Sequence, residues 1–348
     1  MVTAREAEAL LQGLLEQYSP SRRESGAVVY LVRRMAELGF QAWVDGAGNA
    51  VGLLGEGETT VLLLGHIDTV PGYISVRRHD GRLYGRGAVD AKGPLATFVV
   101  AAARAGARAN RRIMVVGAVE EEAATSKGAR YLLSRVSPSV VAIGEPSGWD
   151  RVTVAYRGRL LIDYEVHQEI GHTAGPNSGA CEAAVTFWRR VQAYAEAFNR
   201  DRRRVFDRLD PSLRTMHAEQ DGFIETASLT IGLRLPQGVD LEALKADLKG
   251  LTGDGSVRFY GAESAYRASK ATPLARAFVR AIDEEGGRLQ FKVKSGTSDM
   301  NVVGPVWQVP ILAYGPGDSS LDHTPREFIE LQEYHRAIAV LTRVLQEL

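Results

Sequence analysis

The chain has 348 residues, of which 45% are hydrophobic and 24% are charged, and its formal net charge is zero. The length exceeds the usual size of one hydrophobic core and predicts two domains, while the lack of a basic excess argues against a nucleic-acid-binding protein. Cys181 is the single cysteine, which excludes an internal disulfide and a cysteine-based zinc site.

The sequence also argues against a membrane protein. No apolar run approaches the ~20 residues of a membrane span. The N-terminal residues 1–18 carry acids in an amphipathic pattern and resemble neither a signal peptide nor an anchor. We therefore expect a cytoplasmic protein.

In chain order, residues 1–150 alternate between helix-like and strand-like patterns. Thr3 is expected to cap the first helix, with Glu6 as its capping-box partner. Asp80-Gly81 is expected at the turn of a hairpin. The expected helices are residues 3–17, 21–38, 94–103 and 127–133, and the expected strands are residues 40–44, 50–54, 61–64, 113–119 and 140–143. This alternation predicts a mostly parallel α/β sheet flanked by helices.

The pattern changes near Trp149, where the alternation becomes typical of a half-exposed sheet. Strands are expected at residues 151–156, 160–167, 227–235 and 256–260, and helices at residues 182–199 and 241–248. This β-α-β-β-α-β-like order suggests a small α+β domain inserted into the first one. The last expected elements are a helix at 273–285, strands at 291–294 and 311–314, and a helix at 331–348. We expect a catalytic domain from residues 1–150 and 263–348, and an inserted lid or dimerisation domain from residues 151–262.

The stretch LLLGHIDTVPG, residues 62–72, is central to the functional prediction. Its apolar start predicts a buried strand, and Gly65 lets the chain turn as it leaves the sheet. His66 and Asp68 follow two residues apart, so in extended backbone they point to the same side. An imidazole and a carboxylate placed there can hold a metal ion. Taken alone, the motif fits equally well a surface histidine beside a strand-terminal aspartate.

Several other predicted strands and loops also end in acidic or imidazole side chains. In open α/β sheets, ligands bind beyond the carboxyl ends of the strands, and carboxylates crowded there repel one another unless cations neutralise them. Two histidines with several carboxylates and no thiol match a pair of divalent metal ions such as zinc. The residues concerned are His66, Asp68, Asp90, Glu120, Glu121, Glu122, Glu145 and His323.

These residues lie in motifs that resemble a known family. The motifs GHIDTVP, GRGAVDAKGP, the EEE run before ATSKGAR, IGEPSG and LDHTPRE span nearly the whole chain in the expected order. The sequence resembles the M20 group of dinuclear zinc amidohydrolases, which includes acetylornithine deacetylase, succinyl-diaminopimelate desuccinylase and carboxypeptidase G2-like enzymes. The resemblance implies a zinc-peptidase-like fold and metal-dependent amide hydrolysis.

The resemblance also implies a role for each ligand. There would be two Zn²⁺ per subunit, with Co²⁺ as the alternative metal. His66 would bind one ion and His323 the other. The pair Asp90-Ala91, whose peptide bond is often cis in the family, would supply the aspartate that bridges both ions. Glu145 would complete the first site, and Asp68 would orient His66.

The glutamate run would hold the general base and one metal ligand. Measured back from Gly128, the spacing in the family favours Glu121 as the base and Glu122 as the ligand. The shifted pair, Glu120 and Glu121, is the alternative. The base would take a proton from a metal-bound water and deliver it to the leaving nitrogen.

Substrate binding is expected to involve residues outside the ligand motifs. His172 in IGHTAGP matches a family histidine that reaches the oxyanion from a neighbouring subunit, which implies a homodimer; the other interpretation is an ordinary loop histidine. Gly296 and Thr297 could hold a substrate carboxylate. Arg234 matches a family arginine that binds the same group, although the family aspartate two residues earlier is Gly232 here.

The whole pattern most resembles the branch that releases lysine, and sometimes ornithine, from the glutamyl γ-carboxyl of an acidic amino-group carrier protein. That reaction is the last step of lysine biosynthesis through α-aminoadipate. The alternatives are a small-molecule deacylase that makes ornithine or diaminopimelate, an M20-type aminopeptidase, and a catalytically silent binding module on the same fold.

One basic segment is a candidate docking surface for such a partner. Residues 199–208, NRDRRRVFDR, contain five arginines and two aspartates, and Arg151, Arg157 and Arg159 add charge at the start of the same predicted domain. The ordinary interpretation is a solvated helix face. Our hypothesis is that this surface receives the acidic carrier protein.

Overall fold

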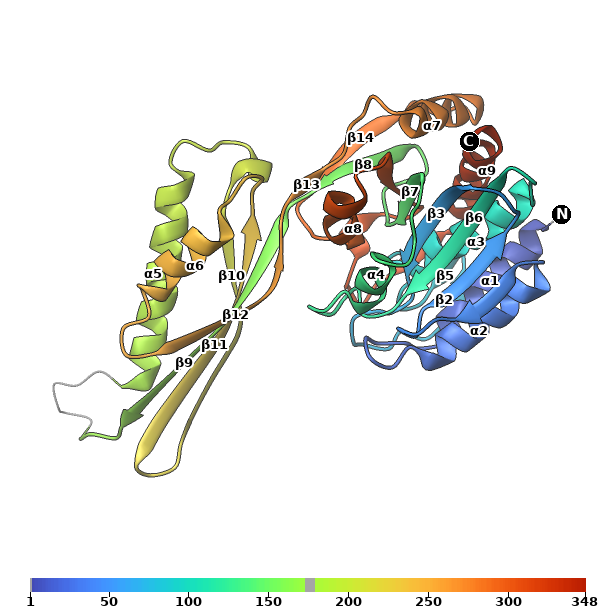
Figure 1. Cartoon of the computed structure of the whole chain (residues 1–348). Helices are drawn as coiled ribbons and strands as arrows, with labels where there is room; N and C mark the ends of the chain where they lie inside the picture. The colour runs from blue at the N-terminus through green and yellow to red at the C-terminus, as the bar shows by residue number, and fades with distance from the viewer. Residues whose placement is uncertain (1, 173–178) are drawn as a thin grey trace. The chain divides into compact units, whose positions relative to one another are not determined.

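A computed structural model describes residues 2–172 and 179–348 and divides them into two compact units. The first unit comprises residues up to 155 together with 267–293 and 298–348, and the second comprises 156–266 and 294–297. Figure 1 shows a helix-flanked sheet in the first unit and a smaller antiparallel sheet with helices on it in the second. The chain therefore leaves the first unit and returns to it, as an inserted domain requires.

The first unit is built on a mixed sheet of nine strands among the described residues, in the order β1-β2-β6-β3-β7-β15-β8-β13, with β14 also paired to β8. The four central strands β6, β3, β7 and β15 are parallel, whereas β1, β2 and β8 pair antiparallel. The predicted α/β class is confirmed. The strands are β1 (Gln41–Val44), β2 (Ala50–Leu54), β3 (Thr59–His66), β6 (Arg111–Ala118), β7 (Val140–Gly144), β8 (Arg151–Tyr156), β13 (Tyr266–Arg267), β14 (Gln290–Lys294) and β15 (Ile311–Tyr314).

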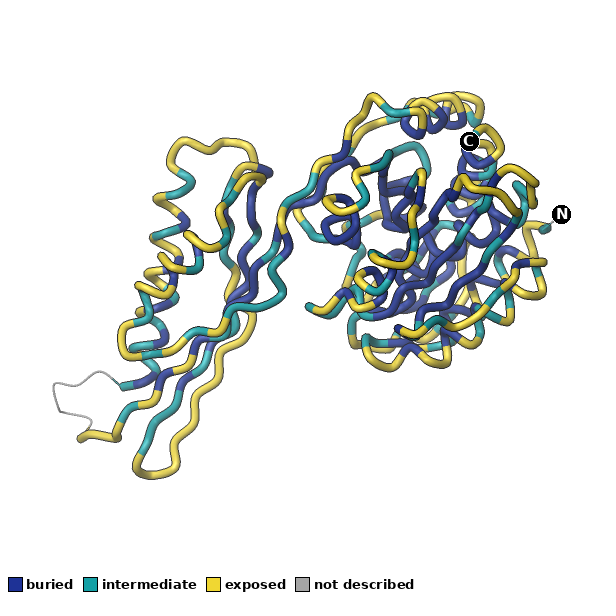
Figure 2. Tube along the Cα trace, in the orientation of Figure 1, coloured by how far each residue is buried: buried dark blue, intermediate teal, exposed yellow. Residues whose placement is uncertain are grey.

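Strand β3 lies in the middle of this sheet, as its apolar sequence predicts. Leu62 and Leu64, which point to one face, and Val61 and Leu63, which point to the other, are all buried, and Figure 2 shows the central strands buried along their length. A strand buried on both faces is typical of a parallel sheet covered by helices on each side. The ladder continues to His66, which pairs with Ala118 of β6.

The helices of the first unit are close to the expected ones. The capping box of Thr3 and Glu6 is present at the start of α1, and α3 packs against α1, α9 and strands β3, β6 and β7. The helices are α1 (Ala4–Glu16), α2 (Ser25–Glu37), α3 (Lys92–Ala105), α4 (Lys127–Leu132), α7 (Pro273–Glu284), α8 (Asp299–Trp307) and α9 (Leu331–Glu347), with a short 3-10 turn η2 (Ser319–Leu321).

Two expectations for this unit were wrong. Helix α2 begins at Ser25 rather than Ser21, because Ser21 and Glu24 hydrogen-bond to loops at the end of the sheet instead of joining a helix. Strand β8 was expected to be half-exposed, but it is buried almost throughout. The reason is that β8 extends the large sheet, pairing with β15 and β14.

A small three-stranded sheet connects two distant parts of the first unit. The predicted hairpin is present as β4 (Arg77–His79) and β5 (Arg82–Tyr84), and Asp80 and Gly81 both have positive φ at its turn. Strand β16 (Phe328–Glu330), from near the C-terminus, pairs antiparallel with β5. This pairing brings the segment after His323 next to the segment before Asp90.

The second unit has the predicted β-α-β-β-α-β order. Its antiparallel sheet has the strand order β10-β11-β9-β12, and α5 packs on β9, β10 and β11. Tyr164 of β9 stacks on Phe187 of α5 with 4.2 Å between the ring centroids. The elements are β9 (Gly158–Glu169), α5 (Ala180–Asn199), a 3-10 turn η1 (Val205–Asp207), β10 (Asp210–Gln220), β11 (Ile224–Leu235), α6 (Leu241–Lys249) and β12 (Ser256–Glu263).

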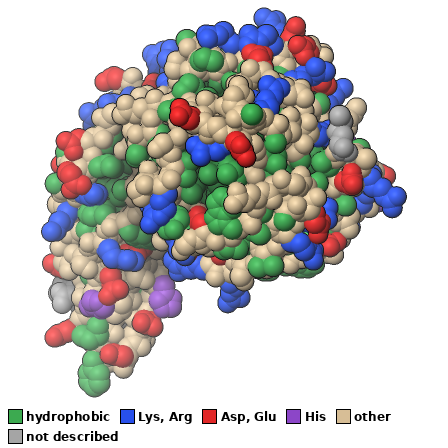
Figure 3. Space-filling model, turned by 45° about the vertical axis from the view of Figure 1, so that its right-hand side comes forward, with side chains coloured by type: hydrophobic (Ala, Val, Ile, Leu, Met, Phe, Trp, Pro, Cys, Tyr) green, Lys and Arg blue, Asp and Glu red, His purple; other side chains and the backbone are tan. Residues whose placement is uncertain are grey.

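Strand β10 was missed by the sequence analysis. It is an exposed edge strand in which Leu213 and Met216 face solvent among polar residues, so no hydrophobic alternation marks it. Figure 3 shows acidic and basic side chains scattered over the visible face of the molecule, with hydrophobic side chains among them. Across the described ranges 2–172 and 179–348, none of the helices has the length and apolar character needed to cross a membrane.

Candidate metal centre

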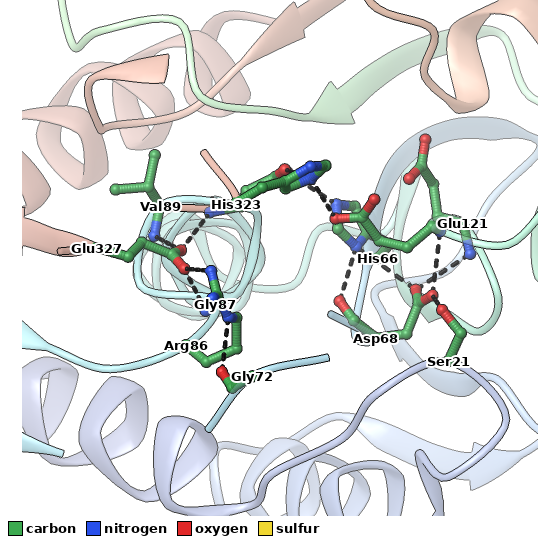
Figure 4. Close-up of polar contacts among 12 residues, drawn as sticks. Ser21, His66, Asp68, Gly72, Arg86, Gly87, Val89, Glu121, His323 and Glu327 are labelled. Carbon is green, nitrogen blue, oxygen red and sulfur yellow. Dashed lines mark hydrogen bonds and ion pairs between the residues drawn. The ribbon is translucent and has the colours of Figure 1, made fainter. Parts of the chain in front are cut away.

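Most of the predicted ligands follow the carboxyl ends of the central strands of the first unit. His66 ends β3, Glu122 follows β6, and Glu145 follows β7 directly. Asp90 lies just before α3, and His323 lies just after η2. Since the carboxyl ends of parallel strands meet at one edge of the sheet, side chains from these separate segments can reach one place, and Figure 4 shows His66 and His323 on either side of it.

The Asp90 carboxylate lies between the two histidines. Its Oδ1 is 3.2 Å from Nε2 of His66, and its Oδ2 is 2.9 Å from Nε2 of His323. The same His323 nitrogen is 2.9 Å from Oε1 of Glu122. One ligand atom each from His66, Asp90 and Glu122 falls within 4.8 Å of the others. Imidazole and carboxylate donors without a thiolate suit zinc and similar divalent ions.

The two ends of this cluster differ in exposure. The His66 side chain is 2% exposed and has Oε1 of Glu145 at 4.0 Å from its Nε2. The His323 side chain is 51% exposed. The cluster is therefore more accessible to solvent at His323 than at His66. The peptide bond Asp90-Ala91 is cis, as the resemblance predicted.

The charged groups of the cluster shift one another's pKa. Hydrogen bonds to Asp90 and Glu122 raise the pKa of His323 to about 11. Burial by itself would lower the pKa of His66, but its contacts with Asp68, Asp90 and Glu121 raise it well above the ordinary value. Burial opposes ionisation of Asp90, yet its bonds to both histidines lower its pKa. Carboxylates packed this closely are stable only with positive charge beside them.

The three consecutive glutamates have different environments. Glu122 points to His323, whereas Oε2 of Glu120 accepts a hydrogen bond of 2.7 Å from the Thr125 hydroxyl. Burial, and then the charges of Glu145, Asp299 and Glu122, raise the pKa of Glu121 well above its usual range. A carboxyl group with a raised pKa can accept and return a proton near neutral pH. Glu122 is therefore the carboxylate inside the cluster, and Glu121 is the one beside it.

Asp68 contacts more than the histidine it was expected to orient. The His66 Nδ1 atom lies 3.0 Å from the Asp68 backbone oxygen and 3.5 Å from its Oδ1. The fully buried carboxylate also accepts hydrogen bonds from the backbone nitrogens of Glu121 and Glu122, both at 3.1 Å, and from the Ser21 hydroxyl at 2.7 Å (Figure 4). Asp68 therefore holds the glutamate turn as well as the imidazole.

Two backbone conformations at the site are unusual for non-glycine residues. Glu120 and His323 have φ values of 59° and 62°, in the left-handed region. Such conformations cost free energy and persist where surrounding contacts enforce them, often at functional sites. At Glu120 the enforcing contact is a bond from its backbone nitrogen to the buried Glu24 carboxylate, at 3.2 Å.

The sequence analysis missed the residues that support the ligands, namely Ser21, Glu24, Arg86 and Glu327. Glu327 and Arg86 form a buried ion pair with 2.9 Å between Nη1 and Oε2. The available signal was that both stand inside the quoted motifs GRGAVDAKGP and LDHTPRE. Ser21 and Glu24 were assigned to a helix, and no local pattern indicated otherwise.

The predicted substrate-binding residues lie in the second unit. Nη1 of Arg234 is 3.4 Å from the Thr297 hydroxyl, and Gly296 precedes this threonine in the same unit. His172 is exposed and follows β9, and the rest of its motif, residues 173–176, lies outside the described residues. The structure therefore brings Arg234 and Thr297 together.

His172 and Arg234 occupy opposite ends of the small sheet. In the backbone ladder between β11 and β9, Arg234 lies opposite Arg159 near one end. At the other end Ile224 lies opposite Glu169, just before His172. Ten residues of strand separate the two ends, which at about 3.3 Å per residue is roughly 33 Å. Within one chain, these two side chains are too far apart to bind one small substrate.

Comparisons with known proteins show the family and the fold of the chain. A sequence model described as peptidase family M20/M25/M40 matches residues 62–347. The LysW-lysine hydrolase of Deinococcus radiodurans is 46% identical, over 99% of this chain and 98% of the relative. The LysW-lysine/LysW-ornithine hydrolase of Saccharolobus islandicus is 29% identical, over 98% and 96%. A metallo-carboxypeptidase structure from Sulfolobus solfataricus shares the fold, with a TM-score of 0.80, 17% identity and 98% coverage of both chains.

Proposed function

The chain belongs to peptidase family M20/M25/M40 and is a hydrolase, and from this premise we propose that it cleaves the amide between lysine, or ornithine, and a carrier protein. The bond joins the amino acid to the glutamyl γ-carboxyl of an acidic amino-group carrier. The observation that supports this substrate is the similarity over 99% of the chain to a relative that is named for LysW-linked lysine. The reaction would release free lysine in the cytoplasm, at the end of lysine biosynthesis through α-aminoadipate.

The family and the donor set imply a divalent metal, and we propose two Zn²⁺ ions, replaceable by Co²⁺. His66 and Glu145 would hold one ion, His323 and Glu122 the other, and Asp90 would bind both. The position of Asp90, with one oxygen facing each histidine, supports this division. When bound, such a metal pair polarises an amide carbonyl and lowers the pKa of water.

The protein's own residues then perform the proton transfers and the positioning. Glu121 takes a proton from the attacking water and returns it to the leaving nitrogen, as its raised pKa and its place beside the cluster allow. Asp68 keeps His66 and the glutamate turn in position. Arg234, with Gly296 and Thr297 nearby, would bind the substrate carboxylate.

The distance between His172 and Arg234 supports a site shared by two chains. If both residues bind one substrate, the ~33 Å between them requires that they come from different subunits. We therefore propose a homodimer in which His172 of one subunit stabilises the oxyanion in the other. Mixing inactive Glu121→Ala protein with inactive His172→Ala protein should restore part of the activity, and no recovery after verified subunit exchange contradicts the shared site.

The proposed docking surface for the carrier is the exposed arginine segment after α5. Arg200, Arg202, Arg203 and Arg204 are exposed, which leaves them available to acidic partners. Arg157 is a correction to the sequence-based hypothesis, because its side chain is buried and pairs with Asp210 at 2.7 Å. Arg157 therefore stabilises the connection between β8 and β9, and it is not part of the docking surface.

Mass spectrometry of a lysine-loaded carrier protein tests the proposed substrate. Incubation with the zinc-loaded enzyme should remove one lysyl group from the carrier, and the Glu121→Ala enzyme should leave the carrier unchanged. An intact carrier, together with rapid hydrolysis of acetylornithine or succinyl-diaminopimelate, would show a small-molecule deacylase instead. Cleavage of peptides alone would indicate an aminopeptidase.

A further inference from the structure

The carboxylate of Glu327 is fully buried and binds four donors from one short segment. Its Oε1 accepts hydrogen bonds from the backbone nitrogens of Val89, at 2.9 Å, and of Asp90, at 3.1 Å. Its Oε2 accepts from the backbone nitrogen of Gly87, at 3.1 Å, and from Nη1 of Arg86, at 2.9 Å. Glu327 thus holds the backbone on which the Asp90 carboxylate is mounted.

The guanidinium of Arg86 extends this connection to two further loops. Its Nε donates to the backbone oxygen of Gly72, at 2.9 Å, and its Nη1 also donates to that of Thr324, at 3.2 Å. Gly72 lies in the loop that begins at His66, and Thr324 is the neighbour of His323. Figure 4 shows the arginine reaching Gly72 on one side while it faces Glu327 on the other.

The ion pair therefore joins three loops, each of which carries one candidate metal ligand. The loops are residues 66–72, 86–90 and 323–327, and they carry His66, Asp90 and His323. They are far apart in the chain, and the bond from Gly87 to Glu327 alone spans 240 residues of sequence. The Arg86–Glu327 pair therefore makes hydrogen bonds to all three loops.

Stability alone does not account for this pair. Removing two charges from water costs several kcal/mol per ion, and well-packed hydrophobic residues are often as stable as a buried ion pair. Here the donors and acceptors are almost all backbone groups of ligand-bearing loops, so the pair specifies loop geometry that hydrophobic residues could not specify. Displacements of about 1 Å matter for a site that depends on aligned ligands.

We propose that Arg86 and Glu327 are positioning residues, which place Asp90 between His66 and His323 before any metal is bound. They act through Asp90 and touch no substrate. The inference rests on the proposed metal centre, and it is independent of which amide the enzyme cleaves.

A second arginine–glutamate pair provides a matched control. Arg82 lies four residues before Arg86 and Glu330 lies three residues after Glu327, and their Nε and Oε1 atoms are 2.7 Å apart. Both side chains are 43% exposed. The change Glu330→Gln therefore removes the same kind of ion pair from β5 and β16 without altering a hydrogen bond to Asp90.

The test compares Glu327→Gln with Glu330→Gln in the full-length protein. The amide nitrogen of glutamine is a donor, so it cannot accept from all the backbone nitrogens that face Glu327. We expect Zn²⁺ and Co²⁺ affinity, measured by calorimetry on metal-free protein, to fall about 10- to 100-fold. We also expect an altered visible absorption spectrum of the Co²⁺ form, and faster amide exchange of residues 86–90 in the metal-free protein. At saturating metal, kcat should fall with little change in KM.

The outcomes separate this inference from the proposed centre. Weak metal binding by the wild-type protein would reject the centre itself. Wild-type affinity and Co²⁺ spectrum in a folded Glu327→Gln protein would overturn the positioning role, and so would an equal effect of Glu330→Gln. If Glu327→Gln does not fold, Arg86→Lys, which keeps the charge but cannot reach Gly72 and Thr324 together, decides by the same measurements. Failure of both variants to fold would make the pair a folding element and reject the proposal.

Discussion

The ligand loops of the first unit and the predicted substrate residues of the second unit are held in different ways. Buried carboxylates of Asp68 and Glu327 fix the backbone beside the ligands in the metal-free protein. In the second unit, His172 is exposed, and the Arg234 guanidinium is 3.4 Å from Thr297 at the other end of the same sheet. The contrast shows that the candidate metal ligands meet within one chain, whereas a substrate site that uses both His172 and Arg234 would require the proposed dimer.

This comparison predicts two classes of variant. Changes near the cluster should alter metal binding or kcat, because they act on groups that are already positioned. Changes in the second unit should alter KM and leave the metal affinity intact. The following experiments test that division, from the largest expected effect to the smallest.

The largest effect is expected for the glutamate run. Glu121→Ala should lower kcat by at least ~100-fold, the scale of a lost general base, while the metal content stays near that of the wild type. Glu122→Ala should instead lose metal, because this carboxylate contacts His323 in the cluster. Metal analysis and kinetics on both variants measure this.

Glu120→Ala is the matched control for this experiment, since Glu120 binds Thr125 outside the cluster. It should keep both activity and metal. Loss of metal from Glu121→Ala but not from Glu122→Ala would show that the assignment is off by one residue, as in the alternative pair Glu120 and Glu121.

Arg234→Ala should raise KM about 10- to 100-fold, because a hydrogen bond to a charged group contributes ~1.5–3 kcal/mol. Metal affinity should not change. Arg258→Ala is a suitable control, since this exposed arginine of β12 pairs with Asp163 in the same unit. A fall in metal affinity without a rise in KM would contradict the division between the two regions.

Metal affinity should rise with pH. In the metal-free protein the pKa of His323 is raised to about 11 and that of His66 is also raised, so both imidazoles carry a proton near neutral pH. A metal ion must displace these protons, and each proton released changes the affinity about tenfold per pH unit. Calorimetry in two buffers of different ionisation enthalpy counts the protons. An affinity that does not vary between about pH 6 and pH 8 would refute the prediction.

The smallest effect is expected for the docking surface. Reversing Arg202, Arg203 and Arg204 to glutamate should raise KM for the lysine-loaded carrier about three- to tenfold at low salt, and less at high salt. Turnover of a short γ-glutamyl-lysine analogue should be unaffected. The control reverses three exposed arginines of the first unit, Arg5, Arg33 and Arg288. An unchanged KM for the carrier at low salt would exclude this surface.

Local patterns were sufficient for much of the fold. The apolar run before His66 predicted the central strand, the spacing of Thr3 and Glu6 predicted the first cap, and Asp80-Gly81 predicted the hairpin turn. These features depend on residues that are neighbours in the sequence, and periodicity and turn chemistry detect such neighbours. In the second unit, the expected helices and the other strands could be predicted for the same reason, whereas β10 could not.

The sequence by itself also determined which side chains are available for a metal centre, because His66, Asp90, Glu122, Glu145 and His323 follow predicted strands or stand in recognisable motifs. Only the tertiary structure decided how they meet, with Asp90 between the two histidines. It also decided that residues 21–24 support the site instead of forming a helix, that β10 pairs at an exposed edge, and that Glu327 holds Asp90. Each of these depends on hydrogen bonds between residues far apart in the sequence, and such pairings leave no mark on local periodicity.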